Sequence, residues 1–229
     1  NFFKTFYESG FPGFIAGVFL SIGFASYVFA MYTTTVANAN FIIATETIFL
    51  VLLGYFFLRE KINSIILISI FLGISGVLLI LGSSLSIQSP EQFVGNLVAF
   101  IMPISFAVLV VIVRKNPKVD MVPAQFTAGV LAALIGLVVA GKLSISFHDL
   151  MLAFLAGFFQ VGLGFILITV GSQTTPAAVV GILMLIETVL GPLWAWLFVH
   201  ETPPISVIIG GGIIIFSILF QSFCGKKSS

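Results

Sequence analysis

Two long stretches of the sequence contain no charged residue, and they restrict the fold more than any other feature. They run from Ser9 to Thr45 and from Leu150 to Ile186. One helical crossing of a bilayer takes about 20 apolar residues, so each stretch is long enough for more than one crossing. Over the whole chain only 7% of the residues are charged, against about 25% in soluble domains. Because a backbone in lipid must satisfy its own hydrogen bonds, the sequence predicts an all-α polytopic membrane protein.

The apolar segments predict eight transmembrane helices joined by short loops. They are placed at 11–31, 38–58, 63–82, 95–114, 121–141, 150–171, 177–198 and 205–224. Of the nine Lys and Arg residues, only Lys142 falls on the side opposite the N-terminus. Cytoplasmic loops carry an excess of Lys and Arg, so both chain ends are expected in the cytoplasm. The other eight are Lys4, Arg59, Lys61, Arg114, Lys115, Lys118, Lys226 and Lys227.

Part of the sequence recurs 141 residues later. Glu46-Thr47 and Glu60 recur as Glu187-Thr188 and Glu201, and the frame holds without gaps from about Phe14 to Glu60. A fixed offset of this kind indicates an internal duplication. Five predicted crossings separate the loop at Glu60 from the loop at Glu201. Since five is odd, the two copies are expected to be inverted in the membrane, as in many secondary transporters.

The duplication divides the chain into a first repeat, 1–88, and a second repeat, 89–229. The first contains three of the predicted helices and the second contains five. If the repeats were originally equal, the full protein has ten helices and the first two precede Asn1. A genuine eight-helix protein is the alternative.

Three segments resemble EamA-type permeases of the drug/metabolite transporter superfamily. They are Phe56–Glu60 (FFLRE), Gly73–Gly76 (GISG) and Leu185–Trp194 (LIETVLGPLW), the last followed by Glu201. The resemblance covers essentially the whole chain. It implies ten helices in two inverted five-helix repeats around a central cavity, in a bacterial inner (plasma) membrane, and it favours export or efflux of the substrate. The cavity helices would be 11–31, 38–58, 150–171 and 177–198.

Glu46 and Glu187 are the acidic residues that are predicted to lie deep in the membrane. At a rise of ~1.5 Å per residue, they lie ~12 Å and ~15 Å along their helices. A charge at the bilayer centre costs ~2.5–3.5 kcal/mol, so such groups usually face the bundle interior or a water-filled cavity. The two carboxyls are predicted to bind the substrate or to couple transport to protons or another ion. The alternative is a neutral carboxyl that bonds to a neighbouring helix.

Further polar and aromatic residues are candidates for lining the cavity. Asn38 and Thr45 are seven residues apart and so share a helical face, and Gln160 lies on the segment expected to face Glu187. The aromatic candidates have interfacial anchoring as the alternative interpretation. They are Tyr27, Tyr32 and Trp194.

The dipeptide Gly191-Pro192 interrupts a predicted helix one turn after Glu187. Proline removes a backbone hydrogen bond and permits a bend. The pair is therefore predicted to be a hinge, with a static packing kink as the alternative.

The residue types that are missing from the predicted helices narrow the function. No Lys or Arg is predicted to lie deep, which disfavours strongly anionic cargo and leaves neutral or cationic metabolites, amino acids among them. No cluster has metal-ligand spacing, and no nucleophile–base set or phosphate-binding glycine loop occurs. We therefore expect no catalytic residue, metal or cofactor. The net charge of +1 gives no reason to expect nucleic acid as a partner.

The sequence thus predicts a secondary-active membrane transporter that moves a small organic metabolite, such as an amino acid or drug-like compound. Alternating access with proton coupling is the expected mechanism, and the expected partners are the substrate, lipid and the coupling ion. A non-transporting membrane scaffold or assembly subunit is one alternative, but it would not need the duplicated deep glutamate. A membrane-embedded enzyme is another, and it would need more converging polar residues. The oligomeric state stays open between monomer and homodimer.

Overall fold

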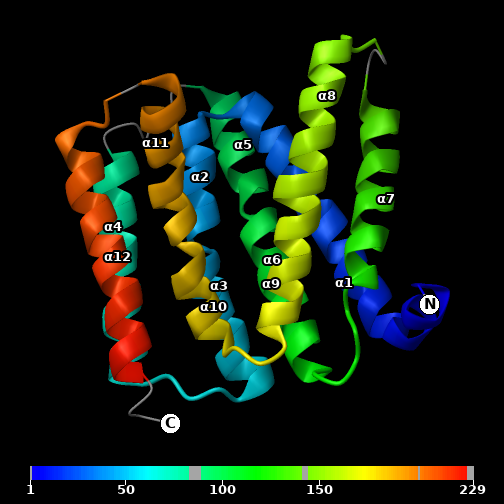
Figure 1. Cartoon of the computed structure of the whole chain (residues 1–229), viewed down its shortest axis with the longest axis horizontal. Coiled ribbons are helices and arrows are strands. Elements are labelled where there is room, and N and C mark those ends of the chain that lie inside the picture. Colours follow the sequence, from blue (N-terminus) through cyan, green and yellow to red (C-terminus); the bar gives the residue numbers. More distant parts are fainter. Residues whose placement is uncertain (1, 83–88, 141–143, 201, 226–229) are drawn as a thin grey trace.

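The structure is a computed structural model that describes residues 2–82, 89–140, 144–200 and 202–225, and Figure 1 shows them as a bundle of helices. The described residues contain helices and no strand. The helices are α1 (Phe2–Thr33), α2 (Val36–Ala44), α3 (Glu46–Leu53), η1 (Gly54–Leu58), α4 (Ser64–Leu81), α5 (Pro90–Ala99), α6 (Ile101–Lys115), α7 (Pro123–Val139), α8 (Phe147–Leu155), η3 (Ala156–Leu163), α9 (Gly164–Ser172), α10 (Ala177–Met184), α11 (Ile186–Val199) and α12 (Ile205–Gly225).

Consecutive helices join into longer apolar rods, which confirms the prediction of an all-α polytopic membrane protein. In the described parts of the chain, 7 rods are long and apolar enough to cross a membrane. The remaining predicted crossing, 121–141, corresponds to the shorter apolar helix Pro123–Val139. The seven rods are Lys4–Thr33, Val36–Leu58, Ser64–Leu81, Pro90–Lys115, Phe147–Ser172, Ala177–Phe198 and Ile205–Gly225.

The rods that contain Glu46 and Glu187 are both tightened near the middle, because each has one turn closed by a hydrogen bond between residues three apart. At the junction of α2 and α3, the Thr45 amide donates to the Ile42 carbonyl at 3.0 Å, three residues back instead of four. At the junction of α10 and α11, the Thr188 amide donates to the Leu185 carbonyl at 3.2 Å in the same way. Such a tight turn inside a helix often marks a hinge or a strained position. Figure 1 shows the two rods running in opposite directions, with α2 and α11 at one end and α3 and α10 at the other.

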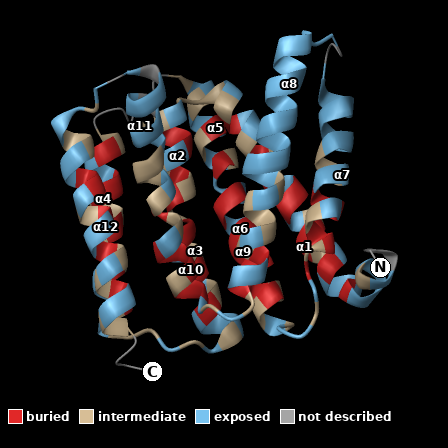
Figure 2. Cartoon of the chain, viewed as in Figure 1, coloured by how far each residue is buried: buried red, intermediate tan, exposed pale blue. Residues whose placement is uncertain are grey.

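Buried side chains gather where α1, α3, α6, α7 and α10 meet, as Figure 2 shows. The largest of them include Leu20, Leu50, Phe106 and Leu109. By contrast, α8 has no buried residue. Its large apolar side chains suit a surface that lipid solvates, because lipid imposes no penalty on exposed hydrocarbon.

Two pairs of helices cross at very short range, and each crossing depends on glycine. The Thr47 hydroxyl of α3 donates to the Gly181 carbonyl of α10 at 2.9 Å, and a Cβ on Gly181 would lie 2.8 Å from Thr47 Cα. Between α4 and α12, a Cβ on Gly76 or on Gly210 would lie 2.7 Å from the carbonyl oxygen of the other. Small residues are the usual means by which membrane helices approach this closely.

A candidate substrate cavity

A cavity of about 330 Å³ lies among α1, α2, α3, α4, α10 and α11. Its polar lining consists of two acids, a phenol, an amide and a hydroxyl, with no Lys, Arg or His among the described lining residues. These polar residues are Tyr27, Asn40, Glu46, Glu187 and Thr188. The other lining residues are Ile43, Ala44, Ile80, Leu81, Met184, Leu185, Gly191 and Pro192.

The two tightened turns place the two acids in this cavity. Glu46 is the first residue of α3, directly after the turn at Thr45, and it is only 5% exposed. Glu187 is the second residue of α11, directly after the turn at Leu185, and its side chain is accessible from the cavity. The two carboxyls line the same cavity. Tyr27 of α1 lines it as well, so three polar groups from three rods converge.

The cavity extends from the level of the two acids to one end of the bundle. Leu81, which lines it, is the last residue of α4, and Gly191-Pro192 leads along α11 toward the same end. In the opposite direction, the path meets the crossing of Thr47 with Gly181, where the two backbones touch. This crossing therefore lies between the two acids and the end of the bundle where α3 and α10 lie in Figure 1.

A second hollow, of about 690 Å³, lies beyond that crossing at the other end of the bundle. Val51, one turn after Thr47, and Ala178, one turn before Gly181, both line it. Its polar lining includes Glu60, Lys61 and Asn63 from the segment between η1 and α4, Arg114 from the last turn of α6 and Gln221 from the end of α12. Two hollows therefore face opposite ends of the bundle, with one helix crossing between them.

Five of the residues singled out from the sequence line the smaller cavity, namely Tyr27, Glu46, Glu187, Gly191 and Pro192. Asn38 and Thr45 lie nearby but are engaged within their own segment. The side-chain nitrogen Nδ2 of Asn38 donates to the Thr34 hydroxyl at 3.1 Å, and the Thr45 hydroxyl donates to the Ile42 carbonyl. These bonds hold the start of α2 and the tight turn that places Glu46.

The remaining three candidates, Gln160, Tyr32 and Trp194, are exposed and line neither of the two hollows. Gln160 lies in the π-helical segment η3. A π turn holds an extra residue, so side chains in it leave the faces that α-helical spacing predicts. Tyr32, in the last turn of α1, is 88% exposed. The centroid of the Trp194 ring lies 5.6 Å from that of the Phe198 ring. Both positions suit interfacial anchors.

Asn40 and Thr188 are lining residues that were not singled out from the sequence as cavity candidates. The duplication contained a signal for Thr188, because it matches Thr47 and follows Glu187 directly. Asn40 had no such signal, since its counterpart at the 141-residue spacing is Gly181.

The model of the EamA-like transporter family matches residues 4–82 and 93–223. The chain belongs to this family. Together with the apolar rods, this membership makes it an integral membrane protein of a transporter family, and it points away from an enzyme. It also confirms the resemblance to the drug/metabolite transporter superfamily.

Curated relatives of this chain are named as transporters. A protein of Clostridium kluyveri named as an uncharacterized transporter is 26% identical over 92% of this chain and 71% of its own length. A Rickettsia bellii protein named as an S-adenosylmethionine uptake transporter is 26% identical over 93% of this chain and 73% of its own length. One crystal structure covers 99% of this chain and 93% of its own, with a TM-score of 0.76 at 17% identity, which shows a shared fold.

Proposed function

We propose that this family member is a secondary-active transporter that moves a small neutral or cationic organic metabolite by alternating access. The observation that carries the proposal is the cavity that both Glu46 and Glu187 line, with no basic residue in the described lining. Carboxyls inside a membrane bundle need a partner that offsets the cost of their charge. Its volume of about 330 Å³ lies at the lower end of the range of ~300–1,000 Å³ that is usual for small-molecule sites.

The name of the Rickettsia relative, an S-adenosylmethionine uptake transporter, supports a cationic substrate. S-Adenosylmethionine carries a sulfonium and an ammonium group, both of which a pair of carboxyls can attract. Tyr27 adds an aromatic face beside Glu187, and aromatic faces also attract cations.

The same carboxyls are proposed to couple transport to protons. In a site of low dielectric constant, two neighbouring negative charges repel strongly, so a proton or a cationic substrate is required to neutralise them. A substrate that binds between them can replace a proton, and a proton can replace the substrate when access changes. In a bacterial inner membrane with both chain ends in the cytoplasm, the proton gradient would then drive transport.

Two pairs of features support an inverted duplication as the basis of alternating access. The two Glu-Thr motifs follow tight turns at Thr45 and Leu185. The two described residues other than glycine with positive φ, Arg59 (56°) and His200 (60°), are also 141 positions apart. Glu201, the counterpart of Glu60, lies outside the described residues. The repeated backbone conformations agree with two copies of one ancestral unit.

Transport by the purified full-length chain in sealed proteoliposomes tests the proposal. A panel of S-adenosylmethionine, amino acids and quaternary amines is offered with the pH gradient in either direction and with none. We expect flux of a neutral or cationic compound that responds to the gradient. An absence of flux of every compound by folded protein would support the scaffold alternative, whereas chemical conversion of a compound would support an enzyme.

A further inference from the structure

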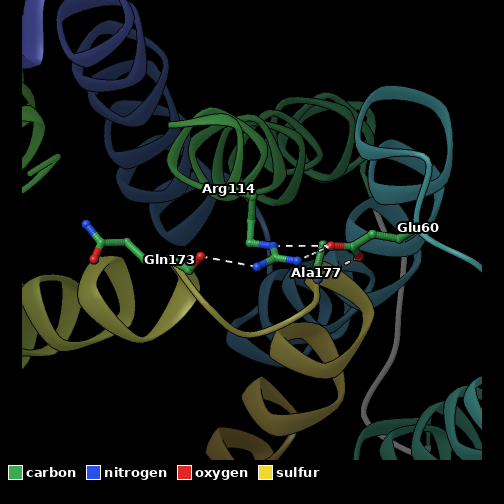
Figure 3. A network of polar contacts seen from close by, with 4 residues as sticks. All are labelled: Glu60, Arg114, Gln173 and Ala177. Carbon is green, nitrogen blue, oxygen red and sulfur yellow. Dashed lines mark hydrogen bonds and ion pairs between the residues drawn. The ribbon is translucent and has the colours of Figure 1, made fainter. Parts of the chain in front are cut away.

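The end of the bundle that is distant from the cavity is held by a compact polar network, shown in Figure 3. Glu60 Oε1 accepts hydrogen bonds from Arg114 Nε at 3.2 Å and from Arg114 Nη2 at 2.9 Å. Glu60 Oε2 accepts the Ala177 amide at 2.8 Å. Arg114 Nη1 donates to the Gln173 carbonyl at 3.1 Å. Two side chains therefore tie together the segment after η1, the end of α6 and the connection between α9 and α10.

The backbone presents Glu60 to this network through a sharp turn. Arg59 adopts a left-handed conformation (φ 56°, ψ 31°) at the end of η1, and the Glu60 amide donates to the Gly54 carbonyl at 3.1 Å. The left-handed residue reverses the chain, so the carboxylate of Glu60 lies against the start of α10. A non-glycine residue in this region stores strain and persists only where the surroundings hold it.

The position of each charge suits the helix end beside it. The carboxylate of Glu60 lies at the N-terminus of α10, and Arg114 lies in the last turn of α6. Helix dipoles favour an anion and a cation at these respective ends. The side chains are only 17% and 22% exposed, so solvent screens their attraction less than that of a surface ion pair. Four charge-assisted bonds make the network specific in geometry.

The network lies where the transport path is closed. Glu60 and Arg114 line the 690 Å³ hollow, and Ala177 is the first residue of α10. One turn further along α10, Gly181 meets Thr47 and separates this hollow from the cavity. For the cavity to reach the basic end of the bundle, α10 has to move away from α3. The network opposes that movement because it holds the first turn of α10.

We propose that Glu60 and Arg114 form a latch that keeps the basic end of the path shut and that opens when access to the cavity switches to this end. This inference rests on the proposed transport function. It assigns an ion pair outside the cavity to the control of access, and it leaves substrate recognition to the residues that line the cavity. The opposing interpretation is a permanent clamp that keeps its bonds in every state.

Side-specific labelling of single cysteines tests the latch without a measurement of flux. Replacement of the one native cysteine, Cys224→Ser, leaves a background without thiols. Ile43→Cys then reports on the cavity, and Val179→Cys reports on the basic-end hollow. Each reporter is exposed to a membrane-impermeant maleimide in vesicles of both orientations. Arg114→Gln opens the latch, and Glu60→Gln does so with almost no change of size. Lys118→Gln, which removes an exposed charge from the loop that follows α6, is the matched control.

If the latch operates, both latch variants raise labelling of the Ile43→Cys reporter from the basic end by roughly fivefold or more, the effect of losing ~1 kcal/mol of closure. Lys118→Gln leaves it unchanged, and the Val179→Cys reporter is labelled from the basic end throughout. Unchanged labelling in folded latch variants overturns the proposal. Failure of both variants to fold also overturns it, in favour of the clamp. Absence of flux in the separate proteoliposome assay would count against transport and not against the latch.

Discussion

The two tightened rods share a Glu-Thr motif, but the motif meets two different surroundings. Glu46 and Thr47 are both buried, and Thr47 bonds across to Gly181. Glu187 is accessible, and Thr188 lines the cavity. The repeated motif therefore fixes where a side chain lies along its helix, whereas the neighbouring helices determine its environment. We therefore expect the first acid to serve mainly in coupling and the second mainly in contact with the substrate.

The largest expected effect comes from Glu46→Gln. This substitution keeps the shape of the buried side chain but removes the proton-binding group. We expect the flux driven by a pH gradient to fall by about a hundredfold, near the upper end of typical coupling between sites, and the remaining exchange to lose its dependence on pH. Glu91→Gln, at an exposed helix start, is the control. Unaltered gradient-driven flux in Glu46→Gln would contradict the coupling role.

The substitution Gly181→Ala tests the close contact between the two rods. The new Cβ would lie 2.8 Å from Thr47 Cα, which is backbone and cannot rotate away. We expect the free energy of unfolding in detergent to fall by about 1–3 kcal/mol, as for an overpacked core. The control is Gly129→Ala, where a Cβ meets no atom within 4 Å. An equal loss of unfolding free energy in Gly181→Ala and Gly129→Ala would show that the contact at Gly181 leaves room for a methyl group in the protein.

A smaller loss is expected from Glu187→Gln, because this acid is accessible and water can replace part of its interaction. The affinity for a cationic substrate should fall roughly tenfold, the order expected for a hydrogen bond to a charged group. The apparent KM reports this change, while the dependence of the maximal rate on the pH gradient should survive. If Glu187→Gln and Glu46→Gln have the same effects on both quantities, the division of roles between the rods is wrong.

The smallest expected effect separates the two threonines. Thr47→Val removes the hydroxyl that donates to Gly181 inside the protein, and it should lower the free energy of unfolding by ~1 kcal/mol. Thr188→Val alters a residue that lines the cavity, where water can solvate the hydroxyl, so stability should change less. Thermal unfolding of both variants under identical detergent conditions measures the difference. A reversed order would contradict the assignment of their surroundings.

Much of the fold could be predicted because lipid restricts the backbone to helices and the charges lie in the loops. The predicted segment 38–58 corresponds to the rod Val36–Leu58, and 205–224 corresponds to Ile205–Gly225. The fifth segment was expected over 121–141, and the corresponding helix, Pro123–Val139, is shorter. The first rod begins upstream of residue 11, but Gly10 has non-helical angles and kinks it near the predicted boundary.

The sequence pointed most directly to those site residues whose charge is costly in lipid. Glu46 and Glu187 are such residues, and both line the cavity. Gln160 was expected to line the cavity because its segment was expected to face Glu187, but that part of the segment is the π-helix η3 and Gln160 is exposed. Arg114 was counted only as a loop charge, because its bond to Glu60 joins residues that lie far apart in the sequence. Contacts of this kind follow from the packing of whole helices, which no local pattern encodes.

Where Gly76 meets Gly210, α4 and α12 touch backbone to backbone. The side chains of Ile214 and Ile80 lie directly against Gly76 and Gly210, respectively, so the two helices interlock and neither can slide along the other. The two helices therefore form a single strut. Under the proposed alternating access, the bending would then fall on the tightened turns at Thr45 and Leu185, which also position the acids.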